Sequence, residues 1–421
     1  MNDRSARATL ITSNRCCAGS QCGPTQLSVL GWPLLLFLIA VSAVGPMALN
    51  GVLPASTAIM ETMDTRYELV QLVLTVFLFA NLVSQLIMGP AADRYGRRPV
   101  MLTGLAVFIL GSFACAFAQN IESLLIARFF QGFGGAVCLF LPRTVVRDLF
   151  DQNKAASVIG YITTAMMIAP LFAPALGGWI TDQASWRLMY LGLAGFGMVL
   201  LIMAWCYQYE TLGMNRRADT SHARVSFIQA STELLRDRGF RACAIMQSGT
   251  VGVYYSFLAG APYVAMESRG MSASSYGVWF SIVAIGYLSG NLVAGRFSQS
   301  QGVYRMVLLG AVPFACGVCL FWTGFISLHP ATLFIPMLIV AFSNGMALPS
   351  MFSIAMSVKP DLAASASGLA GSLQMAVGVL LTLLVGYLLP FGDSWLFFIM
   401  TVSLVMSISG LVLTFRCLGD G

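Results

Sequence analysis

The chain has 421 residues, of which 57% are hydrophobic and only 10% are charged, and its mean hydropathy is +0.79. A soluble globular domain is nearer a quarter charged, so this composition excludes a water-soluble protein and predicts a polytopic membrane protein. The net charge of +6 is scattered through short loops, which argues against a nucleic-acid-binding surface.

Apolar runs long enough to cross a bilayer recur along the chain. We predict twelve spans, at 31–55, 69–90, 99–118, 123–146, 157–180, 187–208, 241–266, 275–297, 305–326, 331–356, 366–389 and 394–416. The longest polar gap divides them six and six, which predicts two bundles joined by a linker. The predicted units are a tail at 1–28, a first bundle at 29–208, a linker at 209–240, a second bundle at 241–416 and a tail at 417–421.

The linker contains a segment, 227–238, with the pattern of an amphipathic helix. Its apolar side holds Phe227, Ile228, Leu234 and Leu235. We expect this helix to lie on the membrane surface.

The charges between the spans predict the orientation. With the N-terminus inside, the outer loops hold three basic and seven acidic residues, a net charge of −4. The inner side holds 19 basic and ten acidic residues, a net charge of +9. Positive charge accumulates on the cytosolic side of membrane proteins. We therefore expect a multi-pass protein of the bacterial inner membrane with both termini and the linker in the cytosol.

Ten cysteines are present, most of them in or beside apolar spans, where a free thiol behaves as a small hydrophobe. Cys16, Cys17 and Cys22 cluster in the N-terminal tail, but no fourth metal ligand is nearby. We expect solvated cytosolic thiols there, and we expect no metal or other cofactor.

A short charged loop, 89–99, separates the second and third predicted spans, and it contains Gly89, Asp93, Arg94, Gly96, Arg97 and Arg98. Its spacing alone fits a positive anchor loop that faces anionic lipid head groups. The run also resembles the loop 2–3 signature of the major facilitator superfamily, Gly-x-x-x-Asp-Arg-x-Gly-Arg-Arg, at every fixed position. The resemblance implies an all-α membrane protein with twelve transmembrane helices in two six-helix bundles.

The fourth predicted span carries an arginine within its apolar run. Arg128 is five residues past the start of the span, about 8 Å deep at 1.5 Å per residue. A charge inside the membrane marks a candidate functional site, and the alternative is an arginine that snorkels to the outer surface. The segment resembles the superfamily motif Arg-x-x-Gln-Gly, which includes Gln131. That resemblance implies a role for the arginine in substrate and proton coupling.

The fifth predicted span contains Pro170, Pro174, Gly177 and Gly178. Two prolines and a glycine pair bend a helix and let a neighbour approach closely, so a kinked packing helix explains the pattern. The run also resembles the antiporter motif Gly-x-x-x-Gly-Pro-x-x-Gly-Gly, with alanine in place of the first two glycines. The resemblance implies export.

The inner end of the fourth span, 143–148, resembles the Bcr/CflA drug-resistance branch of the superfamily, as do the stretches at 186–187, 210–212, 234–237 and 261–264. The resemblance implies a conformational latch that joins the loop at 89–99 to Arg143 and Asp148. In this latch Asp93 faces the N-terminal end of the eleventh span and Arg97 pairs with Asp148. We expect both contacts only while the cytosolic side is closed, so that the latch stabilises an outward-open state.

One position departs from the Bcr/CflA pattern, because Asn50 stands where the first span of that branch carries an aspartate. No acid lies deep in any other span, so an obvious proton carrier is missing. The candidate substrate and coupling residues, each of which could also serve only helix packing, are Asn50, Arg128, Gln131, Gln247, Tyr254 and Asn344.

Two interpretations of coupling stay open. Either Arg128 binds an anionic or zwitterionic substrate directly, or coupling uses a carboxylate nearer the surface, such as Glu61 or Glu267. We favour the first, because an unpaired arginine at that depth requires a counter-charge.

These observations predict a secondary active transporter that exports small amphipathic compounds, drugs or metabolites, by alternating access and ion-coupled antiport. The alternatives are uptake of a specific nutrient or anion and, from another class, a membrane-embedded enzyme. The enzyme is disfavoured because His222 and His329, the only histidines, form no cluster with acids at one depth. We expect a monomer that contacts membrane lipid, a small-molecule substrate and protons, and no nucleic acid.

Overall fold

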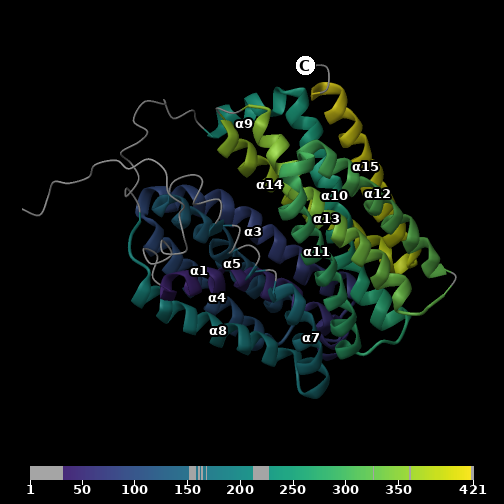
Figure 1. Ribbon diagram of the computed structural model, residues 1–421. Coiled ribbons are helices and arrows are strands. Elements are labelled where there is room, and N and C mark those ends of the chain that lie inside the picture. The colour runs from purple at the N-terminus through teal and green to yellow at the C-terminus, as the bar shows by residue number, and fades with distance from the viewer. Residues whose placement is uncertain are drawn as a thin grey trace, which may run out of the picture.

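The computed structural model is all-helical over the residues that it describes, which are 32–150, 158–159, 162, 165–166, 168–211, 227–325, 327–359 and 362–418 (Figure 1). The first half contains α1 (Trp32–Asn50), η2 (Leu53–Ala55), α2 (Ser56–Thr62), α3 (Tyr67–Tyr95), α4 (Arg97–Ala116), α5 (Ile121–Leu149), α7 (Ile168–Gln183) and α8 (Trp186–Tyr207). The second half contains α9 (Phe227–Arg236), α10 (Arg238–Pro262), η3 (Tyr263–Ser268), α11 (Ala273–Gln301), α12 (Val303–Leu320), η4 (Phe321–Phe325), α13 (Ala331–Ser357), α14 (Ala363–Leu388), η6 (Leu389–Phe391) and α15 (Ser394–Leu418).

The predicted spans coincide with helices. Ten helices in the described ranges are long and apolar enough to cross a membrane. A helix satisfies its own backbone hydrogen bonds, which is what the interior of a bilayer requires of these apolar runs. The fifth predicted span corresponds to α7, and part of its inner end lies outside the described residues. The tail cysteines and most of the predicted linker also lie outside them.

The two halves repeat one kind of turn. Gly96 separates α3 from α4 with a φ of +108°, and Gly302 separates α11 from α12 with a φ of +78°. Glycine adopts such positive φ values without the steric cost that a Cβ atom adds. The sharp reversal between α3 and α4 therefore requires a glycine at position 96, within the charged loop at 89–99.

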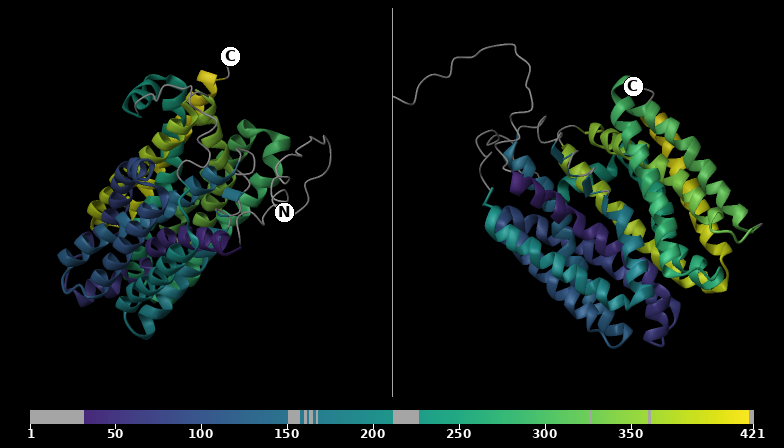
Figure 2. Two further views of the ribbon diagram at one scale, coloured as in Figure 1. Left: turned by 90° about the vertical axis from the view of Figure 1, so that its left-hand side faces the viewer. Right: turned by 60° about the horizontal axis from the view of Figure 1, so that its bottom comes forward.

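The helices form two bundles (Figure 2). In the first bundle, α1, α3, α4, α5, α7 and α8 pack around a core that includes Phe37 and Phe108. In the second, α10 to α15 pack around a core that includes Phe257 and Phe334. Each bundle therefore has its own hydrophobic core. The second core also includes four side chains of the first bundle, where the two bundles meet: Leu53, Tyr67, Leu74 and Leu78.

The bundles join at one end of the molecule. All the hydrogen bonds between the bundles in the described ranges lie at this end. On the first bundle they involve α2, α7, the end of α1 and the start of α3. On the second bundle they involve α10, η3, the start of α11 and the outer part of α14. We call this the closed end. The ribbons diverge toward the opposite end, which we call the open end (Figure 2). Gly96 lies at this end, because α3 begins at the closed end with Tyr67 and ends just before Gly96. The helix α9 lies at the same end (Figure 1). In the predicted topology the open end is cytosolic, so this conformation faces inward.

The helix predicted in the linker is present as α9, within two residues of its predicted end. Its position differs from the prediction. Leu234 is fully buried in a cluster with Phe240, Ala366 and Leu369, whereas Leu235 is 43% exposed. The helix thus packs against α10 and α14 of the second bundle, and only part of its apolar side is free to contact lipid.

Candidate functional site

Arg128 is 1% exposed although it is charged. Its Nε donates to the carbonyl of Val73 on α3 at 3.2 Å, and its Nη1 donates to the carbonyl of Ala48 on α1 at 3.2 Å. Nη1 also donates to Oε1 of Gln131 at 2.6 Å, and Gln131 donates to Oγ of Ser112 on α4 at 2.8 Å. Two neighbouring helices, α1 and α3, therefore hold the arginine directly, and Gln131, which is bonded to α4, positions it.

The guanidinium of Arg128 has no carboxylate partner in the described part of the chain. Its Cζ lies 4.5 Å from the ring centre of Phe77 and 5.8 Å from that of Tyr190, which adds cation–π attraction. Its Nη2 donates no hydrogen bond to any described residue. The snorkelling alternative is excluded in this conformation. In this conformation two carbonyls, an amide and two rings surround the arginine in place of a carboxylate from the described part of the chain.

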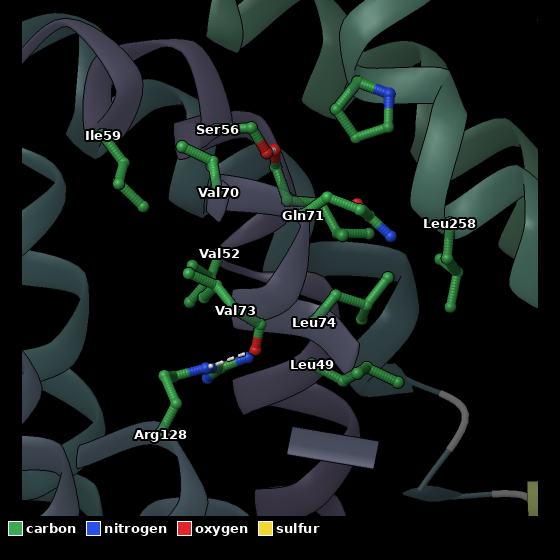
Figure 3. Close-up of a pocket in the computed structure, with 12 residues that line it drawn as sticks. Leu49, Val52, Ser56, Ile59, Val70, Gln71, Val73, Leu74, Arg128 and Leu258 are labelled. Atoms are coloured by element: carbon green, nitrogen blue, oxygen red, sulfur yellow. Dashed lines mark hydrogen bonds between the residues drawn. The ribbon is translucent and has the colours of Figure 1, made fainter. Parts of the chain in front are cut away.

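A small cavity lies beside Arg128, at the junction of the two bundles (Figure 3). Its volume is about 20 Å³, which holds a water molecule and excludes a substrate. Leu49, Val52 and Leu74 line it from the first bundle, and Leu258 closes it from α10. Arg128 is thus next to the surface where the bundles meet, and apolar side chains separate it from the closed end.

Asn50 contacts the second bundle instead of Arg128. Its Nδ2 donates to the carbonyl of Pro46 at 2.9 Å, and its Oδ1 accepts a hydrogen bond from Oη of Tyr254 at 3.3 Å. Asn50 ends α1, and Tyr254 is in the middle of α10. The structure therefore joins two of the predicted candidates in a contact between the bundles.

The two remaining candidates are buried in the second bundle. Gln247 is fully buried, donates to the carbonyl of Met351 at 2.9 Å and accepts from Nε2 of Gln374 at 2.8 Å. Asn344 is 3% exposed, and its Oδ1 has no hydrogen-bond partner in the described ranges. Gln374 on α14 was missed by the sequence analysis, although a lone amide in an apolar span was a visible signal.

Arg97 links two acids at the open end. Its Nη1 lies 2.6 Å from Oδ1 of Asp93, and its Nε lies 2.9 Å from Oδ2 of Asp148. The prediction that Arg97 and Asp148 pair only while the cytosolic side is closed is wrong, because the pair is present with that end open. Its two helices, α4 and α5, are neighbours in one bundle, so the contact does not need the second bundle. The contact of Asp93 with the eleventh span stays a prediction.

The other predicted latch residues do not form one network. Gly89 has no atom near the position that a Cβ would occupy. Arg94 is exposed and lies over the ring of Tyr95, at 5.3 Å from its centre. Arg98 donates to the carbonyl of Trp205 at 2.9 Å. No hydrogen bond or ion pair joins these residues to the exposed Arg143 in the part of the chain that the structure describes.

The start of the linker adds a contact that the sequence analysis missed. The carboxylate of Glu210 accepts hydrogen bonds from the backbone N–H groups of Arg97, at 2.8 Å, and Arg98, at 3.2 Å. The hydroxyl of Thr211 donates to Oδ2 of Asp148 at 3.2 Å. A carboxylate at a helix N-terminus satisfies free N–H groups and complements the helix dipole. The start of the linker is therefore attached to the first bundle at the N-terminus of α4.

The motif in the fifth span forms a close contact at the closed end. Pro170 is in the first described turn of α7 and Pro174 is inside that helix. The backbone at Gly178 meets the backbone of Ala273 on α11, and the backbone of Pro174 meets Gly277 on the same helix. Gly177 packs against the backbone of Gly51 within the first bundle. Glycine is needed where main chains approach so closely.

An aspartate that the sequence analysis did not single out strengthens the same contact. Oδ2 of Asp182, at the end of α7, accepts a hydrogen bond of 2.9 Å from the backbone N–H of Ser274, in the first turn of α11. The hydroxyl of Ser281 donates to the carbonyl of Leu171 at 2.6 Å. Side chains and main chain thus join α7 to α11 over several turns.

The chain matches the family model described as Major Facilitator Superfamily over residues 35–382. It is 31% identical over 370 residues to the uncharacterised MFS-type transporter YdgK of Bacillus subtilis, covering 86% of this chain and 90% of that protein. It is 30% identical over 360 residues to multidrug resistance protein D of Escherichia coli (83% and 88% covered). It is 27% identical over 357 residues to a bicyclomycin resistance protein homolog of Haemophilus influenzae (83% and 88% covered).

The fold is also that of solved transporters. A peptide transporter crystallised in complex with sulfate superposes with a TM-score of 0.74, covering 91% of this chain and 94% of that one, at 13% identity. This likeness confirms the predicted fold class, and the relatives confirm the resemblance to the drug-resistance branch. From the family match, the relatives and the fold together, the chain belongs to the Major Facilitator Superfamily and is a membrane transporter.

Proposed function

We propose that this protein exports small amphipathic compounds that carry a carboxylate or another negative group, as a secondary active transporter with ion-coupled antiport. Export is supported by the partial antiporter motif and by the relatives, two of which are named for multidrug and bicyclomycin resistance. Transport proceeds by alternating access, in which the two bundles rock about a site between them. This role makes the chain a carrier and not an enzyme.

The burial and the hydrogen bonding of Arg128 are the observations that support an anionic substrate. The arginine is buried, a guanidinium carries a positive charge in proteins, and the Nη2 of Arg128 donates no hydrogen bond within the described ranges. The first span offers Asn50 in place of an acid, so nothing there attracts a cation. A substrate carboxylate that reaches Nη2 would form a charge-assisted hydrogen bond, which is stronger than a neutral one.

Uptake of one specific anion is the second candidate, and the missing acid in the first span favours it. A proton-driven exporter needs a group that titrates within the membrane, whereas a carrier of a single anion does not. The direction of net transport in cells separates the two candidates, because an exporter lowers the accumulation of its substrate and an uptake carrier raises it.

The charge asymmetry supports the placement that we propose for the chain. The net charge of +9 on one side against −4 on the other favours an orientation with both termini in the cytosol of a bacterium and the protein in the inner membrane. The outer ends of the spans then form the closed end. We propose a monomer that contacts lipid along both bundles, since each bundle exposes many large apolar side chains.

Transport in reconstituted liposomes tests the substrate class. The probes are fluorescein, an amphipathic carboxylate, and ethidium, a lipophilic cation. We expect wild-type protein to transport fluorescein in preference to ethidium. We expect Arg128→Ala to weaken fluorescein binding about 10- to 150-fold, the equivalent of one lost charge-assisted hydrogen bond. Arg128→Lys keeps the charge and should retain part of the preference.

The melting temperature of each variant serves as the control for folding, because Arg128 holds three helices together. Robust ethidium transport by the wild type that Arg128→Ala leaves unchanged would overturn the proposal. Equal loss of both activities in a variant with normal melting would also contradict it, since the arginine would then serve transport in general.

A further inference from the structure

The guanidinium of Arg128 is surrounded by neutral groups. Its neighbours are two carbonyls, the amide of Gln131 and the rings of Phe77 and Tyr190. Dipoles and rings reduce the cost of burying a charge, but they do not neutralise it, and a guanidinium carries its positive charge in proteins. None of the 17 acids lies within any of the twelve predicted spans, so the spans supply no carboxylate at this depth. A counter-charge beside Arg128 would therefore have to be a mobile anion.

The first span is broken beside this arginine. The helix α1 ends at Asn50, and Pro54 in the following η2 has no N–H group for a continuous helix. In a continuous helix the carbonyl of Ala48 would accept a hydrogen bond from the N–H of Val52, four residues further on. Here that carbonyl accepts from Nη1 of Arg128 at 3.2 Å, and the N–H of Val52 donates no hydrogen bond to a described residue. The break therefore adds an unpaired backbone donor to the unpaired Nη2.

Both of these residues border one cavity (Figure 3). Arg128 and Val52 line this space of about 20 Å³ together with the polar side chains of Gln71 and Ser56. The remaining lining side chains are apolar, and Leu258 of α10 closes the cavity from the second bundle. In such surroundings opposite charges attract each other several times more strongly than in water. A space of this size admits a water molecule or a monatomic anion and excludes a larger organic anion.

We propose that this cavity is a chloride site, in which one chloride ion accepts hydrogen bonds from Nη2 of Arg128 and from the backbone N–H of Val52. The ion supplies the counter-charge that the spans lack. A chloride ion is spherical and accepts hydrogen bonds from several directions, so donors on two spans can share it. Because Leu258 belongs to the second bundle, the site is complete only while the closed end is shut. This inference does not depend on the substrate class proposed above.

Thermal unfolding tests whether chloride binds. The purified protein is heated in chloride buffer and in gluconate buffer of the same pH and ionic strength, because gluconate is too large for the cavity. A ligand that binds the folded protein and not the unfolded chain raises the melting temperature. We expect the wild type to melt at least about 3 °C higher in chloride, with a saturable dependence on the chloride concentration.

Three variants test where the ion binds. Val52→Ile adds a methyl group to a side chain that lines the cavity and should abolish the difference between chloride and gluconate. Val199→Ile is the matched control, because it adds the same group to an exposed side chain on α8 and should keep the difference. Arg128→Gln removes the charge and should also abolish the difference. Since Val52→Ile keeps the arginine, the test does not depend on whether Arg128→Gln folds.

Bromide substitutes for chloride and can be located by anomalous X-ray scattering, so crystals grown in bromide should show a peak beside Nη2 of Arg128. A bromide peak elsewhere and none beside Nη2 would overturn the inference. Equal melting temperatures of the wild type in chloride and gluconate would also overturn it and would assign a water molecule to the cavity. A difference of wild-type size in either Val52→Ile or Arg128→Gln would place the effect of chloride elsewhere. Failure of the proposed function has a separate signature, since absence of fluorescein transport leaves the effect of chloride on melting unchanged.

Discussion

Replacing Gly178 with alanine should shift the protein away from the conformation seen here. A Cβ at this position would lie 2.6 Å from the carbonyl carbon of Ala273 and 3.0 Å from Cα of Ser274, and closer still to the oxygen of Ala273. These are backbone atoms of α11, which cannot rotate away as a side chain can. No atom of the first bundle is among the three nearest. The clash therefore arises only in the conformation in which α7 and α11 meet at this end.

The expected size of the effect follows from the packing. Inserting a methyl group into a tightly packed contact costs about 1–3 kcal/mol. Because the cost applies only to the conformation in which α7 and α11 are in contact, it lowers the population of that conformation relative to the one in which they are apart, about 5- to 150-fold. Gly277→Ala on the other side of the contact meets the backbone of Pro174 and should act in the same direction.

Electron-spin distance measurements can detect this shift. We would place spin labels at Asp64 and Ser394, which are exposed near the closed end of the first and second bundle, in a background without other reactive cysteines. Gly178→Ala should move population from the short distance to a longer one. Gly192→Ala on α8 is the matched control, because its Cβ would meet nothing within 4 Å. Unchanged distances in Gly178→Ala would refute the argument that close backbone contact holds this end shut.

Two further predictions concern the open end and the topology. Asp93→Asn should leave the melting temperature unchanged, because the carboxylate is 70% exposed in this conformation. It should lower transport, because the predicted contact of Asp93 with the start of α14 would form only when the open end closes. Wild-type turnover in this variant would count against the latch. An impermeant maleimide applied to intact cells should leave the tail peptide with Cys16, Cys17 and Cys22 unmodified, since the inner side carries +9; labelled tail peptide in mass spectra would reverse the orientation.

The helices could be predicted from the sequence because the bilayer imposes a simple rule. Each span must be a long apolar run, so α5 was expected at 123–146 and is found at Ile121–Leu149. Breaks in such runs are equally visible, and Gly96 marks one of them. Arg128 stood out because its charge lies deeper within a predicted span than any other charge of the chain, and the structure buries it.

The partners of these residues could not be predicted in the same way. Asn50 and Tyr254 are 204 residues apart in the chain, and Arg97 and Glu210 are 113 apart. Apolar patterns specify that a helix crosses the membrane and do not specify which helix lies beside it. The pairing of Arg97 with Asp148 was anticipated by family resemblance, but its independence of the conformation became clear only once both were located in one bundle.

Two aspartates place the same kind of contact at opposite ends of the molecule. Asp182, at the end of α7, already accepts a hydrogen bond from the first turn of α11. Asp93, near the end of α3, is predicted to meet the first turn of α14 when the open end closes. A helix N-terminus carries roughly half a positive charge, and this attraction fades within one turn. Each aspartate can therefore stabilise only the conformation that brings its helix end close. Rocking of the bundles releases one contact as it forms the other, so the two free energies largely cancel. A modest difference in substrate binding is then enough to decide which end is open.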